Sequence, residues 1–319
     1  MFFKKKILYG DWIWNWLDNK KDYIKESTYA NYTNIISNHI IYDLGKYYLS
    51  NLNNNILQTY LLNKFKEGRL DGKGGLSGKT VRDIVAVIKS SLKTANKEGL
   101  IHNVCLDFIY PKNDSQEKIY VLSLDEQQKL INYVIQNNSI KNMGILLTLY
   151  SGIRIGELCA LQWKDIDFKN NILHINKTLQ RIYIKDNNQK KSKIIITTPK
   201  TRNSKRDIPI NMQFSKELKK YKTHNEDFLL SCDSKWIEPR TYRRYFANIL
   251  KDANINKVNF HSLRHTFATN CIKLGIDYKT VSELLGHATV NITLNLYVHP
   301  QMYQKKKCID LICKSFINR

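Results

Sequence analysis

The sequence predicts a mainly α-helical protein of two domains that contains a small antiparallel β-sheet. Apolar residues recur with helical spacing over most of the chain, and a polar stretch interrupts this pattern near Pro111. In three segments the apolar residues instead recur with a period of two, which is typical of strands: NILHINKT, RIYIKD and KIIITT. A length of 319 residues allows two domains, each with its own apolar core.

The first domain is predicted to be a small bundle of about four helices between Ser27 and Ile101. Helical spacing runs through TYANYTNIISNHII, NILQTYLLNKFK and KTVRDIVAVIKSSLKTANKEGLI, with breaks at Gly45 and in DGKGGLSG. The chain starts with MFFKKKILYGDWIWNWL, which resembles a signal peptide. Asp11 and Asn15 interrupt its apolar stretch, and no small-residue cleavage site follows, so export is not indicated.

The polar stretch PKNDSQEK marks the boundary between the domains. It predicts a first domain over residues 1–112, a linker over 113–119 and a second domain over 120–319. Ser123 and Glu126 form an S-x-x-E pattern that satisfies free amides at a helix start, so the second domain is expected to open with a helix. Three glycines follow helical segments and are expected to end them: Gly152, Gly275 and Gly286.

The composition points to nucleic acid as the partner. Lys and Arg number 51 against 28 Asp and Glu, a formal charge of +23, and both predicted domains are basic. No apolar run approaches the roughly 20 residues needed to cross a bilayer, so membrane insertion is not expected. The six cysteines form no C-x-x-C pair, so neither a zinc site nor a disulfide framework is expected, and a reducing cytoplasm fits.

Two motifs offer cations for a phosphate. Breaking a phosphodiester without a metal requires a nucleophile, cations near the nonbridging oxygens and an acid for the leaving 5′ oxygen. Arg154, in GIRIGEL, can grip two phosphate oxygens, although an arginine beside Glu157 is by itself more often part of an ion pair. His261 and Arg264, in HSLRH, lie on one face of a helix near its first turn, where both can contact one phosphate.

Three further residues supply the other chemical groups. His287, in LLGH, follows a glycine that is expected to end a helix, and Tyr297, in TLNLYVH, is one of 19 tyrosines. Lys200, in TTPKTRNSKRDIPI, is predicted to lie at the tip of a hairpin between two extended segments. Each residue alone is more often structural or merely solvated, so the interpretation depends on their joint order.

This ordered set of motifs resembles the tyrosine recombinases, also called the phage integrase family. GIRIGEL is similar to the family's first arginine box, TPKT to its lysine turn, HSLRH to its His-x-x-Arg box, LLGH to its second histidine and TLNLYVH to its nucleophile segment. The resemblance runs from about Ser27 to Tyr303. The chain departs from the family at Asn103 and Val104, where Asn-Pro is common, and is expected to lack the arm-binding domain of larger integrases.

The resemblance implies a helical, SAM-like core-binding domain and an α+β catalytic domain that form a C-shaped clamp on DNA. It also implies a reaction in which a tyrosine attacks the scissile phosphate and leaves a 3′-phosphotyrosine, with no ATP, metal or other cofactor. The implied roles are nucleophile for Tyr297, phosphate stabilisation by Arg154 and Arg264, proton acceptance or orientation by His261, leaving-group protonation by Lys200, phosphate binding by His287 and support of the site by Glu157.

The resemblance further implies that a homo-tetramer acts on two specific sites in duplex DNA through a Holliday junction. It places the protein in the cytoplasm of a bacterium, or in a phage or mobile element, in association with the nucleoid. Accessory DNA-bending or directionality proteins are compatible with this plan. The tail KKKCIDLICKSFINR contains a short apolar stripe. Whether this predicted helix docks on its own protomer or on a neighbouring one is left open.

Two other functions share part of the pattern. An architectural DNA-binding protein would bind and bend DNA without strand exchange, and the complete set of six residues argues against it. A type IB topoisomerase would relax supercoils as a monomer, and the core-binding resemblance argues against that. Among recombinases, integration or excision of a mobile element and DNA inversion rank above dimer resolution. The target sequence cannot be read from the chain, since it depends on which side chains reach base edges.

Overall fold

The computed structural model describes residues 6–102, 107–111, 119–186, 189–199 and 202–297, together with 306, 309, 310, 312, 313 and 316. The chain divides into two compact units. Unit 1 comprises Met1–Glu117 and Arg181–Lys193, and unit 2 comprises Lys118–Gln180 and Ile194–Arg319. Asn103, Val104, most of the predicted linker and most of the C-terminal tail lie outside the described residues.

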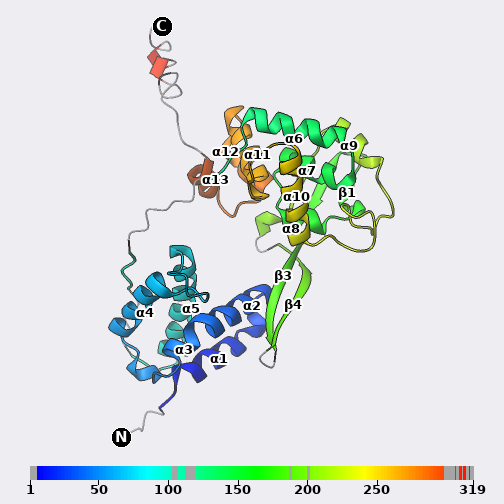
Figure 1. Ribbon diagram of the computed structural model, residues 1–319. Helices are drawn as coiled ribbons and strands as arrows, with labels where there is room; N and C mark the ends of the chain where they lie inside the picture. The colour runs from blue at the N-terminus through cyan, green and yellow to red at the C-terminus, as the bar shows by residue number, and fades with distance from the viewer. Residues whose placement is uncertain are drawn as a thin grey trace. The chain divides into compact units, whose positions relative to one another are not determined.

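Unit 1 is a helical bundle around a large apolar core with a smaller apolar cluster beside it, which confirms the helical first domain (Figure 1). Its longest helix begins where the Ser77 side chain accepts a hydrogen bond from the Thr80 amide at 3.2 Å. The helical elements are α1 (Tyr9–Asn19), η1 (Lys21–Tyr23), α2 (Glu26–Ile35), the π-helical turn η2 (Ile36–Ile40), α3 (Ile41–Leu44), η3 (Leu49–Asn51), α4 (Asn54–Glu67) and α5 (Gly78–Lys97).

Helix α1 lies before the stretch in which the sequence pattern predicted helices. Asp11 and Asn15, which interrupt the apolar run at the chain start, are exposed. They therefore mark the solvent face of an amphipathic helix. The opposite face carries large apolar side chains that are all buried in the core of unit 1: Trp12, Ile13, Trp16 and Leu17.

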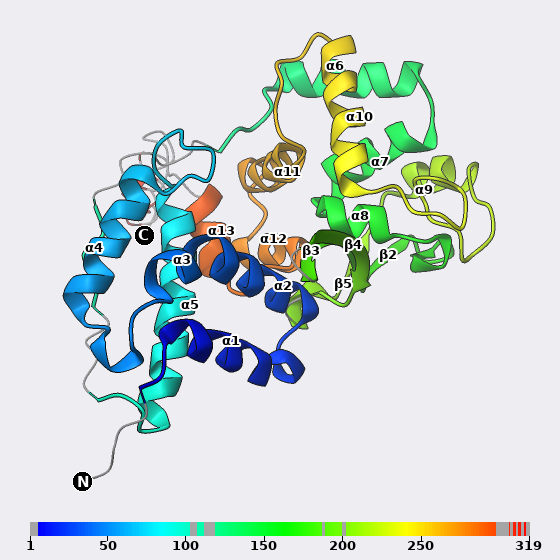
Figure 2. The ribbon, with the colours of Figure 1, turned by 60° about the horizontal axis from the view of Figure 1, so that its bottom comes forward.

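Unit 2 opens with the predicted helix. The Glu126 amide donates to the Ser123 hydroxyl at 3.2 Å, and the Ser123 amide donates to the Glu126 carboxylate at 2.8 Å, which confirms the capping box. Helix α11 packs against α7, and α12 and α13 pack against α11 (Figure 2). The helices are α6 (Leu124–Gln136), α7 (Ile140–Ser151), α8 (Ile155–Ala160), η4 (Trp163–Asp165), α9 (Met212–Lys219), α10 (Pro239–Asp252), α11 (His261–Lys273), α12 (Tyr278–Leu285) and α13 (Val290–Tyr297).

The strands form two small sheets rather than one. Strands β1 (Ile166–Asp167), β2 (Ile172–Ile175) and β5 (Arg206–Pro209) form an antiparallel sheet in the order β1-β2-β5. In its register Leu173 faces Ile208, and both side chains are buried in the core of unit 2. Strands β3 (Thr178–Asp186) and β4 (Gln189–Thr197) pair with each other in the second sheet.

The predicted hairpin around Lys200 is wrong. Strand β4 pairs with β3, whereas β5 pairs with β2, so the chain between β4 and β5 connects two different sheets. This connection contains a short helical turn, η5 (Arg202–Ser204). Alternating apolar residues identify strands but not their partners, which depend on packing elsewhere in the chain. Lys200 itself lies outside the described residues.

In the described part of the chain, no helix has the length and apolar character needed to cross a membrane. The same residues contain no group of three or more His, Cys, Asp or Glu side chains arranged to hold a metal ion. The described motif residues instead lie in unit 2, on and around α8, α11, α12 and α13.

Candidate active site

Each of the three glycines that were predicted to end helices in unit 2 is left-handed; Gly275, after α11, has φ of 82°, and the other two lie at the site. Gly152 follows α7 with φ of 66°, and Gly286 follows α12 with φ of 64°, as the sequence predicted. Residues other than glycine rarely adopt this backbone conformation, and a Cβ atom on Gly152 would also lie 2.5 Å from the Phe267 ring. The two turns leave backbone carbonyls at helix C-termini, where the helix dipole favours cations.

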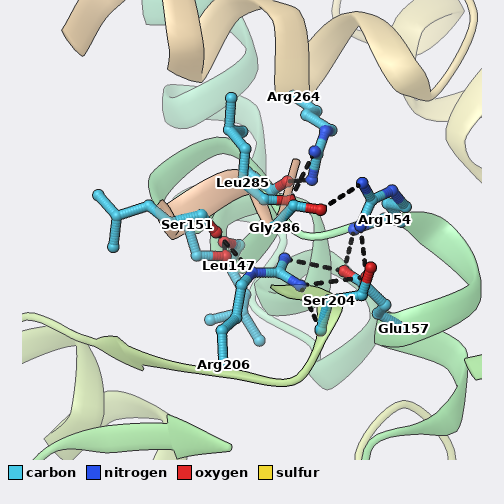
Figure 3. A network of polar contacts seen from close by, with 11 residues as sticks. Leu147, Ser151, Arg154, Glu157, Ser204, Arg206, Arg264, Leu285 and Gly286 are labelled. Carbon is cyan, nitrogen blue, oxygen red and sulfur yellow. Dashed lines mark hydrogen bonds and ion pairs between the residues drawn. The ribbon is translucent and has the colours of Figure 1, made fainter. Parts of the chain in front are cut away.

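Arg264 is bound by these two helix ends. Its Nη1 donates to the Gly152 carbonyl at 2.7 Å. Its Nη2 donates to the Leu285 carbonyl at 2.6 Å (Figure 3). The side chain belongs to the first turn of α11 and is only 1% exposed. Burial, together with the charge of Arg154, lowers the pKa of Arg264 to about 9. The guanidinium is therefore charged at neutral pH, in a setting that would favour an additional negative charge.

Arg154 occupies the turn between α7 and α8. Its backbone amide donates to Glu157 Oε2 at 2.8 Å, which satisfies a free amide at the start of α8. Its guanidinium donates to Glu157 Oε1 at 2.8 Å and to the Gly286 carbonyl at 3.1 Å. The Arg154 side chain is 36% exposed, so part of its guanidinium remains accessible from solvent.

Arg206, at the start of β5, was not identified from the sequence. Its Nη2 lies 2.9 Å from Glu157 Oε2, and its Nε donates to the Leu284 carbonyl at 2.6 Å. Both partners of this ion pair are buried, with exposed fractions of 6% for Arg206 and 3% for Glu157. Figure 3 shows the Glu157 carboxylate between Arg154 and Arg206. Arg206 thus fixes the carboxylate that in turn holds Arg154.

The cluster carries excess positive charge. The guanidiniums of Arg154 and Arg206 contact the single carboxylate of Glu157 (Figure 3), and that of Arg264 lies near enough for Glu157 to influence its pKa. Burial alone would raise the pKa of Glu157, but Arg206 and Arg154 outweigh it and hold that pKa below its ordinary value. Glu157 is therefore ionised at neutral pH. The remaining positive charge suits an anion with several oxygens, such as a phosphodiester.

Replacing Glu157 with glutamine should lower the free energy of unfolding by about 3 kcal/mol at pH 7, because it leaves a buried arginine without its counter-charge. The folded-state pKa of Glu157 is depressed, so its stabilising contribution is present above the unfolded-state pKa of about 4.3 and is lost as pH falls through the folded-state value. Urea unfolding of wild type and variant should therefore show a difference that narrows toward pH 3.

The matched control is Glu217→Gln, which removes an exposed carboxylate on α9 that pairs with Lys220, the residue after this helix. Its effect should stay within about 0.5 kcal/mol, since surface ion pairs contribute little. Equal effects of the two substitutions at pH 7 would contradict a structural role for the buried carboxylate.

Tyr297 ends α13 and is 8% exposed. Its ring belongs to a small apolar cluster with Ala268, Val281 and Leu285. Its hydroxyl oxygen lies 2.7 Å from Nδ1 of His265, which follows Arg264 in α11. Burial raises the pKa of the phenol, and the charges of Arg264 and Arg154 partly oppose that rise. The phenol is thus protonated at neutral pH, within the field of two guanidiniums.

Two of the predicted histidines adjoin this tyrosine. His287 is 8% exposed; its Nδ1 lies 2.8 Å from the Thr293 hydroxyl, and its ring is nearly parallel to that of Tyr297, with centroids 6.4 Å apart. Burial and nearby arginines lower its pKa to about 3. His261 contacts His265 edge-on, with centroids 4.5 Å apart, and burial, followed by His265 and the two nearby arginines, lowers the pKa of His261 to about 4. Both rings are neutral at pH 7.

The structure brings together the predicted site residues that it describes: Arg154, Glu157, His261, Arg264, His287 and Tyr297. Lys200 is the one member that falls outside the described residues. Sequence reasoning missed Arg206 and His265. A signal existed for His265, because residues 261, 264 and 265 have the spacing of one helix face. Arg206 carried no comparable signal, since its partner Glu157 lies far away in the chain.

Comparisons with known proteins cover both units. Residues 120–304 match the Phage integrase family, and residues 8–65 match the N-terminal SAM-like domain of phage integrases. The second match begins at residue 8 and so includes α1, whereas the sequence motifs suggested a resemblance only from about Ser27.

Individual relatives are distant in sequence but long in overlap. A tyrosine recombinase XerC-like protein of Caldanaerobacter subterraneus subsp. tengcongensis is 28% identical, over 90% of this chain and 77% of its own. The ICEBs1 integrase of Bacillus subtilis is 26% identical, over 74% of this chain and 66% of its own. The solved structure of the transposon Tn1549 integrase with a circular intermediate DNA covers 96% of this chain and 99% of its own, with a TM-score of 0.76 and 20% identity.

Proposed function

This chain belongs to the phage integrase family, and we propose that it is a site-specific tyrosine recombinase that cleaves and rejoins duplex DNA through a 3′-phosphotyrosine on Tyr297. The observation that carries the proposal is the position of the Tyr297 hydroxyl. The hydroxyl forms a hydrogen bond with His265 and lies in the electrostatic field of Arg154 and Arg264, which belong to a cluster with excess positive charge. A scissile phosphate placed there would meet both a nucleophile and the cations that stabilise its transition state.

The proposed roles rest on the contacts of the described residues and, for Lys200, on its place in the TPKT motif. Arg154 and Arg264 stabilise the charge that grows on the nonbridging oxygens, as donors in an oxyanion hole do. His287 donates to the phosphate through Nε2, which requires the Thr293 hydroxyl to donate to Nδ1 so that Nε2 carries the ring proton. His261 orients the phosphate from the start of α11, Glu157 fixes Arg154, and Lys200 protonates the leaving 5′ oxygen.

We assign DNA binding to both parts of the chain. The core-binding domain would comprise residues 1–112, the linker 113–119 and the catalytic domain 120–319. The net charge of +23 supports contact with a polyanion along both domains. A tetramer acting on two sites through a Holliday junction would complete strand exchange, with the C-terminal segment contributing to contacts between protomers. The reaction conserves bond energy in the phosphotyrosine, so it needs no ATP.

The biological outcome that we favour is integration or excision of a mobile element. The relatives include a protein named as the ICEBs1 integrase, and this name supports that outcome over inversion or dimer resolution.

Covalent capture of DNA tests the proposal. The full chain is expressed in cells, the protein is purified under denaturing conditions, and DNA that remains attached is sequenced to identify the target. A nicked duplex of that sequence is then incubated with purified protein, and the adduct is digested and analysed by mass spectrometry. The expected result is a nucleotide attached to the peptide that contains Tyr297. An adduct on another residue, or no adduct at all, would reject the proposal.

The purified protein and the captured DNA sequence also distinguish the recombinase from the two alternative functions. An architectural protein would bind and bend the captured duplex without a covalent adduct. A type IB topoisomerase would relax plasmids that lack the captured sequence. A recombinase should instead join two duplexes only where both carry it, which gel analysis of the joined products would show.

A further inference from the structure

His265 contacts the atom that would attack the phosphate. It follows Arg264 in α11, and its Nδ1 lies 2.7 Å from the hydroxyl oxygen of Tyr297. The two rings are 5.5 Å apart between centroids and tilted by 54°, so the imidazole meets the phenol through its nitrogen and does not stack on it. This contact joins α11 to α13 across 32 residues of sequence. A proton acceptor for a phenol must lie within such hydrogen-bond reach.

The other two histidines of the site are placed differently. Nδ1 of His287 is engaged by Thr293, and its ring lies parallel to that of Tyr297 with centroids 6.4 Å apart. His261 contacts the ring of His265 edge-on. Within the described part of the site, His265 is therefore the histidine whose ring nitrogen is bonded to the nucleophile.

The protonation states fit transfer from the phenol to the imidazole. Burial raises the pKa of Tyr297, so its hydroxyl carries a proton. Burial and the charge of Arg264 lower the pKa of His265, so its ring is neutral at pH 7. With the phenol protonated and the ring neutral, the tyrosine can donate to Nδ1, and this direction requires the tautomer of His265 that carries the ring proton on Nε2. The titratable and charged groups seen to face His265 are His261 and Arg264 on its own helix and Tyr297 on α13.

We propose that His265 is a further catalytic residue, whose Nδ1 accepts the phenolic proton as Tyr297 attacks the scissile phosphate. The inference rests on the proposed recombinase function. The bond between phosphorus and the tyrosine oxygen forms, the bond between phosphorus and the 5′ oxygen breaks, and the leaving oxygen takes a proton from Lys200. When a 5′ hydroxyl attacks the phosphotyrosine, each proton returns by the reverse route.

His265→Asn separates proton acceptance from hydrogen bonding. The side-chain oxygen of asparagine can occupy the place of Nδ1 and accept a hydrogen bond, but it does not take up the proton. Single-turnover cleavage of the captured nicked duplex by the full chain should fall by about 10²-fold or more in both His265→Asn and His265→Ala. DNA affinity should be unchanged. The variants' rates should rise with pH as the phenol ionises, whereas the wild-type rate should level off once His265 is neutral.

A second substrate shows whether the His265 variants fail to remove the proton from the tyrosine or fail to protonate the leaving group. In a 5′-bridging phosphorothiolate, sulfur replaces the leaving oxygen, and a thiolate departs without needing a proton. The defect of the His265 variants should persist on this substrate, whereas that of Lys200→Ala should be relieved. Relief of the His265 defect by sulfur would overturn the assignment, as would a His265→Asn rate equal to that of wild type. His261→Asn tests the other histidine that could accept the proton. If only His261→Asn showed both the rise of rate with pH and the persistent defect on the phosphorothiolate, the assignment to His265 would be overturned.

Wild-type protein offers a test that does not depend on the folding of variants. In protein labelled with ¹⁵N-histidine, the Nδ1 of His265 should show the chemical shift of an unprotonated ring nitrogen, and His265→Gln should remove that signal. A protonated Nδ1 would overturn the proposal, because that nitrogen could not accept from the phenol. The two proposals fail in different ways. If the chain is not a recombinase, wild-type protein forms no adduct with DNA. If only the role of His265 is wrong, wild-type protein forms the adduct and the His265 variants form it at the wild-type rate.

Discussion

Replacing Tyr297 with phenylalanine should abolish the covalent protein–DNA adduct, a loss of at least about 10⁴-fold. The substitution removes only the attacking oxygen, because the ring that packs against Ala268, Val281 and Leu285 is kept. The lost hydrogen bond to His265 should lower the free energy of unfolding by about 1 kcal/mol, which leaves the protein folded. A denaturing gel of protein incubated with the nicked duplex measures the adduct, and a gel-shift assay should show unchanged DNA affinity.

The matched control is Tyr278→Phe, on the exposed side of α12, where the ring is 41% exposed. This variant should form the adduct at the wild-type rate. If Tyr297→Phe still formed an adduct that resists denaturant, the nucleophile would be a different residue and the role given to Tyr297 would be wrong.

Local chemistry made much of this site predictable from the sequence. A left-handed helix end favours glycine, so Gly152 and Gly286 marked the two turns that present carbonyls to the arginines. Helical spacing placed His261 and Arg264 in one first turn, and the structure confirms it. These features depend on residues close together in the chain, which is why sequence patterns reveal them.

The remaining features depend on contacts between distant segments. Arg206 matters because β5 brings it to Glu157, 49 positions earlier, and no local pattern encodes that pairing. The connection at Lys200 was misassigned because alternation identifies a strand but not its partner. The apolar run of α1 resembles a signal peptide, and the sequence pattern does not show that Asp11 and Asn15, which interrupt this run, form the solvent face of a helix.

The buried part of the site is built to hold charge before DNA arrives. Carbonyls at the ends of α7 and α12 and the Glu157 carboxylate fix the guanidiniums of Arg264 and Arg154. Such fixed donors need little reorganisation when charge develops on a phosphate, and this is the main source of electrostatic catalysis. The geometry of Arg264 should therefore matter as much as its charge.

Replacing Arg264 with lysine should lower single-turnover cleavage of the nicked duplex by about 10²- to 10³-fold while DNA affinity changes little. Lysine keeps the positive charge, but its single nitrogen cannot reproduce two separate donors at 2.7 Å and 2.6 Å from the Gly152 and Leu285 carbonyls. One carbonyl at a buried helix end then loses its partner, and the cation moves away from the phosphate. Arg244→Lys, at an exposed position on α10, is the control and should cleave at the wild-type rate. Cleavage by Arg264→Lys within threefold of wild type would mean that charge alone suffices and that the bidentate grip on the two helix ends has no catalytic role.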